Sequence, residues 1–303
     1  MDLTARLFSL ACRVGDREKN RGLTDPEDII PHENIPFGPL EETQLLDVYT
    51  PRERALGEKL PVVVSVHGGG WVYGSKESYR FYCMSLAQHG FGVVNFTYRL
   101  APQYPHPAQM EDLDLVVAWV QEKGAAYGLD RERIFLVGDS AGGHLAALYA
   151  CVCTNPECAR LYPTLSPNGF VPLGLALNCG VYLMEKVPVP VELVARLTLQ
   201  LLGEQAGEED YYNASPSHFV TRDYPPTFLM TANLDFLKGQ APLLREKLGE
   251  VGVPYRYRVF GTDRRPLGHV FHCDLRLEQA ARCNREEMEF FREILRSRER
   301  IEK

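Results

Sequence analysis

Short apolar runs alternate with segments of helical period along most of the chain, and this alternation is what most constrains the fold. The runs show little of the in-and-out pattern of a half-exposed strand, which predicts strands that are buried on both faces. Strands separated by helices indicate a mostly parallel central sheet with helices on both faces, an α/β fold. We predict strands at 45–49, 62–66, 92–96, 134–137, 173–177, 227–231 and 255–260. Helices are predicted at 77–89, 108–123, 142–152, 239–250 and 275–297.

Two segments fall outside this rhythm. Residues 1–40 precede the first clear predicted strand, and residues 181–215 carry prolines, a helical stretch and an acidic loop. Ligands of open α/β folds bind at the carboxyl edge of the sheet, and insertions of this kind commonly cover that edge. The sequence has no linker rich in glycine or serine and no internal repeat. We therefore expect a single domain, 1–303, with helical cap elements at about 1–40 and 181–215.

The bulk composition argues against several classes of protein. The chain has 303 residues, a net charge of −7 and no basic cluster, so we expect no nucleic-acid partner. No apolar run approaches the roughly 20 residues that a transmembrane helix needs, so we expect no membrane span. The N-terminal stretch has an acid at position 2 and no small-residue cleavage site, which predicts a helix rather than a signal peptide.

The eight cysteines are scattered, and Cys151, Cys153 and Cys179 lie inside apolar segments. Such placement is typical of reduced core thiols and predicts a cytoplasmic location. A zinc site can be drawn from Cys151, Cys153 and Cys158 with His144 nearby. It is disfavoured because Cys151 and Cys153, two residues apart on a predicted helix, point to different faces. We expect neither a metal nor a cofactor.

A cluster of small residues surrounds Ser140 between a predicted strand and a predicted helix. Gly138, Ser140 and Gly142 form a GxSxG pattern, in which glycines let the chain turn sharply and present a serine nucleophile. Two other interpretations are a plain tight turn and a phosphate cradle. The phosphate interpretation is weaker, since no Lys-Ser/Thr follows the glycines and the spacing does not fit GxGxxG. The strand and helix on either side favour the nucleophile.

A second glycine run, His67 to Trp71 (HGGGW), ends the predicted strand 62–66. Glycines there leave backbone N–H groups free to point at the carbonyl oxygen of an ester. Ala141, at the start of a predicted helix, would supply a further N–H where the helix dipole also favours negative charge. The run therefore predicts an oxyanion hole, with a glycine-rich turn of no function as the alternative.

Three motifs together carry a family resemblance: HGGGW at 67–71, YRLAP at 98–102 and GDSAGG at 138–143. In this order they resemble the hormone-sensitive-lipase family of α/β-hydrolase esterases, over about residues 44–295. The resemblance implies the α/β-hydrolase fold, an N-terminal cap, and a carboxylesterase that acts on short acyl esters through a Ser–His–Asp triad. It places the oxyanion hole on Gly69, Gly70 and Ala141. The chain departs from the family in having Gln103 after YRLAP and the sequence DFLKG at 235–239.

The catalytic base is sought among the histidines that follow Ser140, because the chain order in this fold is serine, acid, histidine. They are His218, His269 and His272. His218 precedes any suitable acid at a strand end, so we expect a structural role for it. His269 lies in the loop between strand 255–260 and the last helix, where similar proteins have their histidine. We predict His269 as the base, with His272 as the alternative.

The catalytic acid is sought among Asp235, Asp263 and Asp274. Asp235 comes just after strand 227–231, at the edge that would also carry the serine and the histidine, so we predict that it orients the imidazole. Asp263 lies on the same loop as the histidine, but Thr-Asp after glycine is also ordinary turn chemistry. Asp139 is expected to make a structural hydrogen bond, because neighbouring side chains on a sharp turn point apart.

His67 is expected to brace the glycine loop, and Tyr98 and Arg99 to pack and tether the chain near the site. The predicted partner is a small-molecule ester. Two alternatives stay open: a deacetylase of acetylated sugars or amides, and a non-catalytic receptor for a small ligand on the same fold. The filled histidine position argues against the receptor. Homodimers are common among similar proteins, but nothing in this sequence requires one.

Overall fold

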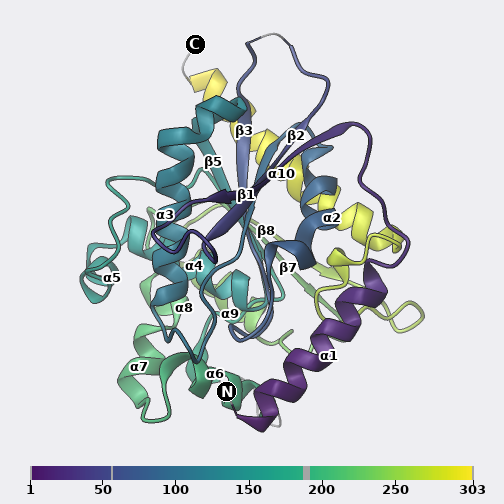
Figure 1. The fold of residues 1–303 in the computed structure, drawn as a ribbon. Coiled ribbons are helices and arrows are strands. Elements are labelled where there is room, and N and C mark those ends of the chain that lie inside the picture. Colours follow the sequence, from purple (N-terminus) through teal and green to yellow (C-terminus); the bar gives the residue numbers. More distant parts are fainter. Residues whose placement is uncertain (1, 56, 187–191, 302–303) are drawn as a thin grey trace.

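The computed structural model describes residues 2–55, 57–186 and 192–301. Its centre is an eight-stranded sheet in the order β1-β2-β4-β3-β5-β6-β7-β8 (Figure 1). The strands from β4 to β8 pair in parallel, whereas β1 and β2 pair antiparallel at one edge. This is the mostly parallel sheet that the sequence predicted. The strands are β1 (Ile29–Pro36), β2 (Leu45–Pro51), β3 (Leu60–Val66), β4 (Gly92–Phe96), β5 (Leu129–Asp139), β6 (Leu175–Asn178), β7 (Thr227–Ala232) and β8 (Tyr255–Phe260).

Helices cover both faces of the sheet, and successive residues of the strands alternate between them. On one face Val62 and Val64 join the apolar cluster of α3 (Ala108–Lys123) and α4 (Ala141–Thr154). On the other face Val63 joins the cluster of α2 (Lys76–Ala87) and α10 (Glu278–Ile301). Each fully buried valine contributes about 1.5–3 kcal/mol to the free energy of unfolding. The predicted helices are all present: α2 (Lys76–Ala87), α3 (Ala108–Lys123), α4 (Ala141–Thr154), α9 (Gln240–Val251) and α10 (Glu278–Ile301).

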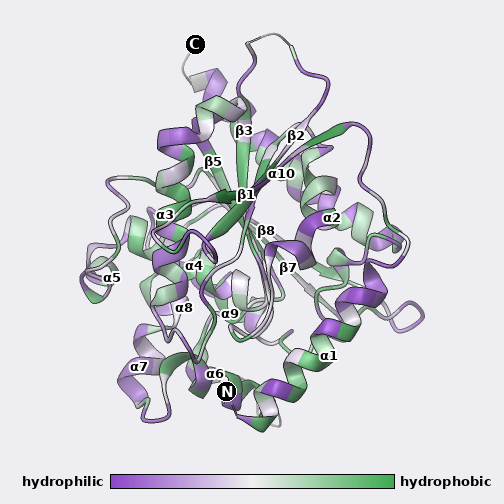
Figure 2. Cartoon of the chain, viewed as in Figure 1, coloured by the Kyte–Doolittle hydropathy of each residue, from purple (hydrophilic) through white to green (hydrophobic). Residues whose placement is uncertain are grey.

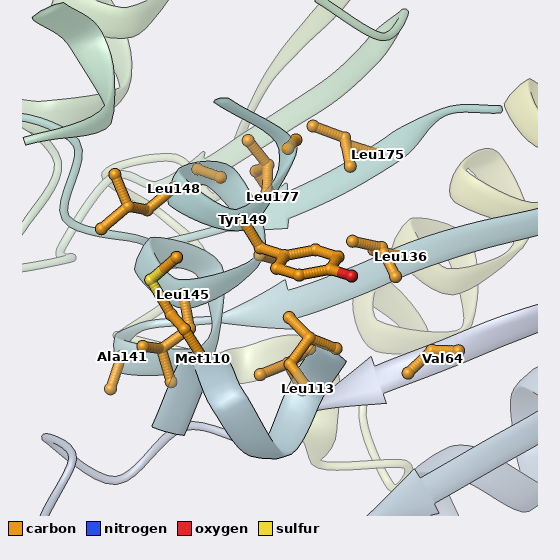
Figure 3. Packing of buried hydrophobic residues seen from close by; sticks show 14 of the residues in the cluster. Val64, Met110, Leu113, Leu136, Ala141, Leu145, Leu148, Tyr149, Leu175 and Leu177 are labelled. Carbon is orange, nitrogen blue, oxygen red and sulfur yellow. The ribbon is translucent and has the colours of Figure 1, made fainter. Parts of the chain in front are cut away.

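The packing around α4 explains why its sequence is apolar on every side. Labelled side chains from α3, α4 and strands β3, β5 and β6 lie together there (Figure 3). Tyr149 and Leu145 of α4 are fully buried, as are Leu136 and Leu177 of the strands. Hydrophobic residues are concentrated in the central strands, and the outer surfaces of the helices are mixed or hydrophilic (Figure 2). The helix that follows Ser140 is thus held rigidly against the sheet.

Two helices cover the carboxyl edge of the sheet. They are α1 (Leu3–Lys19) and α6 (Glu192–Leu202), which pack against each other although they are far apart in the sequence (Figure 1). Part of the predicted cap segment 1–40 has a different place, because 29–36 form the edge strand β1. The exposure of β1 alternates along the strand because one side faces solvent, so it lacks the continuous apolar run that is typical of a fully buried strand.

Shorter elements complete the segment between β6 and β7. They are η2 (Met184–Lys186), α7 (Glu208–Asn213) and α8 (Pro216–Phe219). Residues 187–191 of the second predicted cap segment lie outside the described residues. The remaining short helices are η1 (Gly124–Tyr127), α5 (Pro156–Leu161) and η3 (Phe271–Cys273). Among the described residues, no helix combines the length and the hydrophobicity that crossing a bilayer requires.

Candidate active site

Ser140 occupies the single residue between β5 and α4, and its backbone is in a rare conformation. Its φ of 52° and ψ of −117° lie in a region that side-chain-bearing residues seldom adopt. The flanking glycines make this turn possible: a Cβ on Gly138 would lie 2.4 Å from the Gly142 carbonyl oxygen, and one on Gly142 would lie 1.9 Å from that of Val66. The local sequence therefore forces the serine outward at the carboxyl edge of the sheet.

His269 and Asp235 reach Ser140 from two neighbouring strand ends. Asp235 follows β7, and His269 lies in the loop that follows β8. The Nε2 atom of His269 is 2.9 Å from Ser140 Oγ, and its Nδ1 atom is 2.7 Å from Asp235 Oδ1. The structure thus brings the three predicted residues together in one hydrogen-bonded chain. Such a chain can move a proton from the hydroxyl to the imidazole and stabilise the imidazolium that results.

Asp235 is held as a carboxylate although only 2% of its surface is exposed. Burial by itself raises the pKa of this group, but hydrogen bonds from His269, the Leu237 N–H and the Thr231 hydroxyl outweigh it and leave the pKa below its usual value. The last two bonds are each 2.8 Å long. They fix the orientation of the carboxylate, and through it the orientation of the imidazole ring.

The glycine run after β3 lines the same cavity as Ser140 and His269. Gly69 has a φ of 120° and Gly70 a φ of 57°, both in the left-handed region that favours glycine. The Gly68 N–H donates to the Tyr79 hydroxyl at 2.9 Å. By contrast, the N–H groups of Gly69, Gly70 and Ala141 donate to no residue that the structure describes. An oxyanion hole needs donors of this kind, so these three groups remain the predicted candidates for it.

A cavity of about 400 Å³ lies over Ser140 and His269. Its floor is the glycine run and the serine turn, and its roof comes from the cap helices α1 and α6. One wall is Phe236, and the centroid of its ring lies 4.3 Å from the centroid of the His269 ring. The cap residues among its lining are Phe8, Cys12, Gly15, Asp16 and Lys19 from α1, with Leu193, Val194 and Leu197 from α6.

The family model BD-FAE matches residues 46–248, which include Ser140 and Asp235 and end before His269. The chain belongs to the BD-FAE family. The relatives and structural neighbours named below are esterases, and the chain has the α/β-hydrolase fold that the hormone-sensitive-lipase resemblance implied. The family resemblance and the fold class predicted from the sequence are confirmed.

Two curated relatives of this BD-FAE family member are from Mycobacterium tuberculosis. Esterase LipQ is 29% identical over 67% of this chain and 48% of its own length. Carboxylesterase NlhH is 29% identical over 78% of this chain and 76% of its own length. The chain spans only about half to three fifths of LipQ and of the relatives LipI and LipC. Over those matched lengths the likeness is to esterases.

Solved structures resemble the whole chain. Esterase B from Lactobacillus Rhamnosis has a TM-score of 0.89 and 26% identity, and the match covers 98% of this chain and 96% of that one. An esterase from Pyrobaculum calidifontis has a TM-score of 0.76 and 25% identity, covering 97% and 94% of the two chains. The cap segments therefore lie inside the matched region, since these alignments extend well beyond residues 46–248.

The alternative histidines and acids of this BD-FAE family member lie in other surroundings. His218 pairs with Glu185 at 2.7 Å. His272 is fully buried, and burial lowers its pKa to about 3. Asp263 is exposed on its loop, and Asp274 accepts hydrogen bonds from Arg276. Among the candidate histidines and acids, it is His269 that contacts the Ser140 hydroxyl, and Asp235 is linked to it through His269.

The supporting roles expected beside the site are present. The Tyr79 hydroxyl donates to Asp139 at 2.7 Å, and burial raises the pKa of Asp139 to about 6. The His67 ring contacts the Gly68 carbonyl at 2.7 Å and stacks on Tyr98 with the ring centroids 3.9 Å apart. Arg99 forms ion pairs with the acids of α3. Tyr79, which links the glycine loop to Asp139, was not anticipated.

Metal-ligating side chains come together in two places among the described residues. One is Asp139, His272 and Cys273, and the other is Cys179 with the Asp235 and His269 described above. Neither place contains the zinc cluster considered in the sequence analysis. Both ring nitrogens of its histidine, His144, have other hydrogen-bond partners. Its Nδ1 accepts from the Trp71 indole at 3.2 Å, and its Nε2 lies 2.7 Å from the Ala214 carbonyl oxygen. All eight cysteines are free thiols.

The contribution of α1 to the cavity was missed beyond a general expectation of a cap. Phe8, Cys12, Asp16 and Lys19 are spaced by four, four and three residues, so they share one face of a helix. This periodicity is visible in the sequence. The residues that this face contacts cannot be identified from the sequence, because they come from segments far along the chain.

Proposed function

We propose that this chain is a serine carboxylesterase that hydrolyses short-chain acyl esters through an acyl-enzyme. The observation that carries the proposal is the hydrogen-bonded chain from Ser140 Oγ through His269 to Asp235, with distances of 2.9 Å and 2.7 Å. Esterases among the relatives and the structural neighbours support the same reaction. The small volume of the cavity, about 400 Å³, supports a short acyl group.

The first half of the reaction forms the acyl-enzyme. Ser140 Oγ bonds to the ester carbonyl carbon while Nε2 of His269 accepts the hydroxyl proton. The carbonyl oxygen becomes an oxyanion that accepts hydrogen bonds from the N–H groups of Gly69, Gly70 and Ala141. The bond from carbon to the alcohol oxygen then breaks, and the alcohol takes the proton from His269 as it leaves.

Water completes the second half by the same groups. His269 accepts a proton from the water as its oxygen bonds to the acyl carbon. The bond to Ser140 Oγ breaks, Ser140 recovers its proton, and the carboxylic acid leaves. Asp235 remains a carboxylate throughout, and its role is to hold the imidazole in position. The buried ion pair that it forms in each half-reaction contributes to the stabilisation of the transition state.

The test is the turnover of a chromogenic acetate ester by the wild type and by Ser140→Ala. The variant is expected to fold normally and to lose about 10⁴-fold or more of kcat. Circular dichroism and thermal unfolding provide the fold control. A Ser140→Ala protein that kept most of the esterase rate would rule the proposal out.

A second candidate is removal of acetyl groups from hydroxylated compounds such as sugars. One observation favours it: a lysine and an aspartate of α1 line the same cavity as Ser140. The chemistry at the serine would be unchanged, and only the alcohol part of the substrate would differ. Comparing kcat/KM for acetate esters of a sugar and of a simple alcohol tests this candidate.

A further inference from the structure

The cavity over Ser140 is apolar at one end and charged at the other, and α1 runs along both. Phe8 and Lys19 lie eleven residues apart on the same face of this helix, which is about 16 Å along its axis. Phe8 is close to Gly70, because a Cβ on that glycine would lie 3.0 Å from the phenyl ring and 2.7 Å from Leu197. Lys19 stands beside Tyr79 at the other end.

The charged end is built from a fixed pair of side chains. Lys19 Nζ lies 2.8 Å from Asp16 Oδ1, and it stands over the Tyr79 ring at 5.0 Å from the centroid. The Tyr73 hydroxyl donates to Asp16 Oδ2 at 2.8 Å. The side chains of Lys19 and Asp16 are 17% and 20% exposed, and both line the cavity. Each keeps hydrogen-bonding capacity, since an ammonium has three donors and a carboxylate about four acceptor positions.

The charges around this end disfavour an anionic ligand. Asp16, Asp139 and Asp274 line the cavity, and Lys19 is the one lysine or arginine among the lining residues that the structure describes. A carboxylate or phosphate would therefore meet more negative than positive charge. A hydroxyl group suits the Lys19–Asp16 pair better, because it can accept from Lys19 and donate to Asp16 at the same time. Hydrogen bonds to charged partners are also the stronger kind.

The position of His269 indicates which part of the ester lies at this end. The leaving alcohol takes its proton from His269, so the alcohol part must lie next to that ring. The segment after His269 supplies Phe271, Cys273, Asp274 and Leu277 to the cavity lining. The pKa of the Asp274 carboxyl is lowered mainly by Arg276 and to a smaller extent by the Lys19 ammonium, so this segment lies within electrostatic reach of the charged pair.

We propose that the Lys19–Asp16 pair binds a hydroxyl group on the alcohol part of the substrate. The preferred substrates are then short acyl esters of hydroxylated alcohols, such as glycerol or a sugar, rather than of simple alkyl alcohols. This inference rests on the proposed esterase function, and it names the substrate class of that same site.

The test compares two acetate esters that differ only in hydroxyl groups, glycerol monoacetate and propyl acetate. The wild type is expected to show a kcat/KM ratio in favour of the glycerol ester. Lys19→Met should lower that ratio by about tenfold to a hundredfold, the value of a hydrogen bond to a charged group. Asp16→Asn, which keeps the shape of the side chain, should lower it in the same direction. Arg17→Met, on the exposed side of α1, is the matched control and should leave the ratio unchanged.

Three results would overturn the inference. One is a wild type that does not prefer the glycerol ester, and another is a ratio that neither Lys19→Met nor Asp16→Asn changes. The third is a preference that Lys19→Met removes only when the hydroxyl is on the acyl part, as in propyl lactate compared with propyl propanoate. If Lys19→Met unfolds, Asp16→Asn still decides the question.

Covalent labelling of Ser140 by an organophosphonate, measured in each variant, separates this inference from the proposed function. A protein that labels at Ser140 but shows an unchanged ratio contradicts only the hydroxyl site. A wild type that neither labels nor cleaves any of the esters contradicts the esterase itself, and the hydroxyl site with it.

Discussion

The sheet edge that carries Ser140 and the cap that covers it differ in what fixes their shape. At the edge, backbone atoms approach so closely that Gly142 has no room for a Cβ, and three side chains are joined by short hydrogen bonds. In the cap, α1 and α6 meet through side chains, and several leucines of α1 face solvent. We therefore expect the edge to hold one reaction geometry. Substitutions among the cap residues that line the cavity are expected to change which substrate binds.

The largest effect is expected at the sheet edge. Asp235→Asn should lower kcat by about 10⁴-fold, because an amide cannot stabilise the imidazolium and favours the wrong tautomer of the ring. Steady-state kinetics with a short-chain ester measures it. Asp263→Asn, the exposed alternative acid on the histidine loop, is the control and should behave as wild type. Equal losses in the two variants would contradict the assignment of the acid.

A backbone change at the same edge should have the next largest effect. Gly142→Ala places a Cβ 1.9 Å from the Val66 carbonyl oxygen and forces the serine turn to shift. A displacement of about 1 Å can cost about 10²-fold in rate, and overpacking costs about 1–3 kcal/mol of stability. Gly239→Ala is the control, since nothing lies within 4 Å of a Cβ there. Kinetics and urea unfolding of both variants decide whether the turn is as tight as described.

Helix α10, which packs on one face of the sheet, also differs from the cap in holding a fully buried acid. Burial raises the pKa of Glu287 from 4.5 to about 8. Between these values the folded protein keeps a proton that the unfolded chain releases, so stability falls as pH rises, by about 1.4 kcal/mol for each pH unit. Glu287→Gln should flatten this dependence in unfolding experiments from about pH 5 to about pH 8. Glu289→Gln, exposed on the same helix, should retain the wild-type slope.

The smallest effect is expected in the cap. Phe8→Ala removes part of the apolar end of the cavity and leaves the sheet edge untouched. Losing about 1 kcal/mol of ground-state binding raises KM about fivefold with kcat nearly constant. Leu7→Ala, which is 59% exposed on α1, should change neither constant. A fall in kcat as large as that of Gly142→Ala would mean that the cap shapes the reaction geometry as well.

The same contrast explains which features the sequence could predict. The serine turn requires glycines at two fixed positions, so Gly138 and Gly142 are enough to predict it from the sequence. Most strands of the sheet contain a continuous apolar run, and the seven strands predicted between 45 and 260 are all present, with ends within five residues of the predicted ones. Strand β1 was missed because its alternating, proline-containing sequence reads as irregular, and only its pairing with β2 makes it a strand.

Contacts between distant segments are the part that the sequence could not supply. The order serine, acid, histidine left Asp263 and His272 open as alternatives, and the choice depends on distances across loops. Lys19 and Asp16 carry a helical spacing, but their neighbours Tyr79 and Tyr73 come from more than fifty residues away. Helix periodicity indicates which side chains share a face, but the residues that this face contacts depend on tertiary packing.

The central claim is that Ser140 is the nucleophile activated by the chain to Asp235. Its most direct test is reaction with an organophosphonate followed by mass spectrometry of the intact protein and of its peptides. We predict one adduct per chain, located on Ser140, and slow or absent labelling when His269 is replaced by alanine. Labelling of another residue, or equal labelling of the Ser140→Ala variant, would contradict the account.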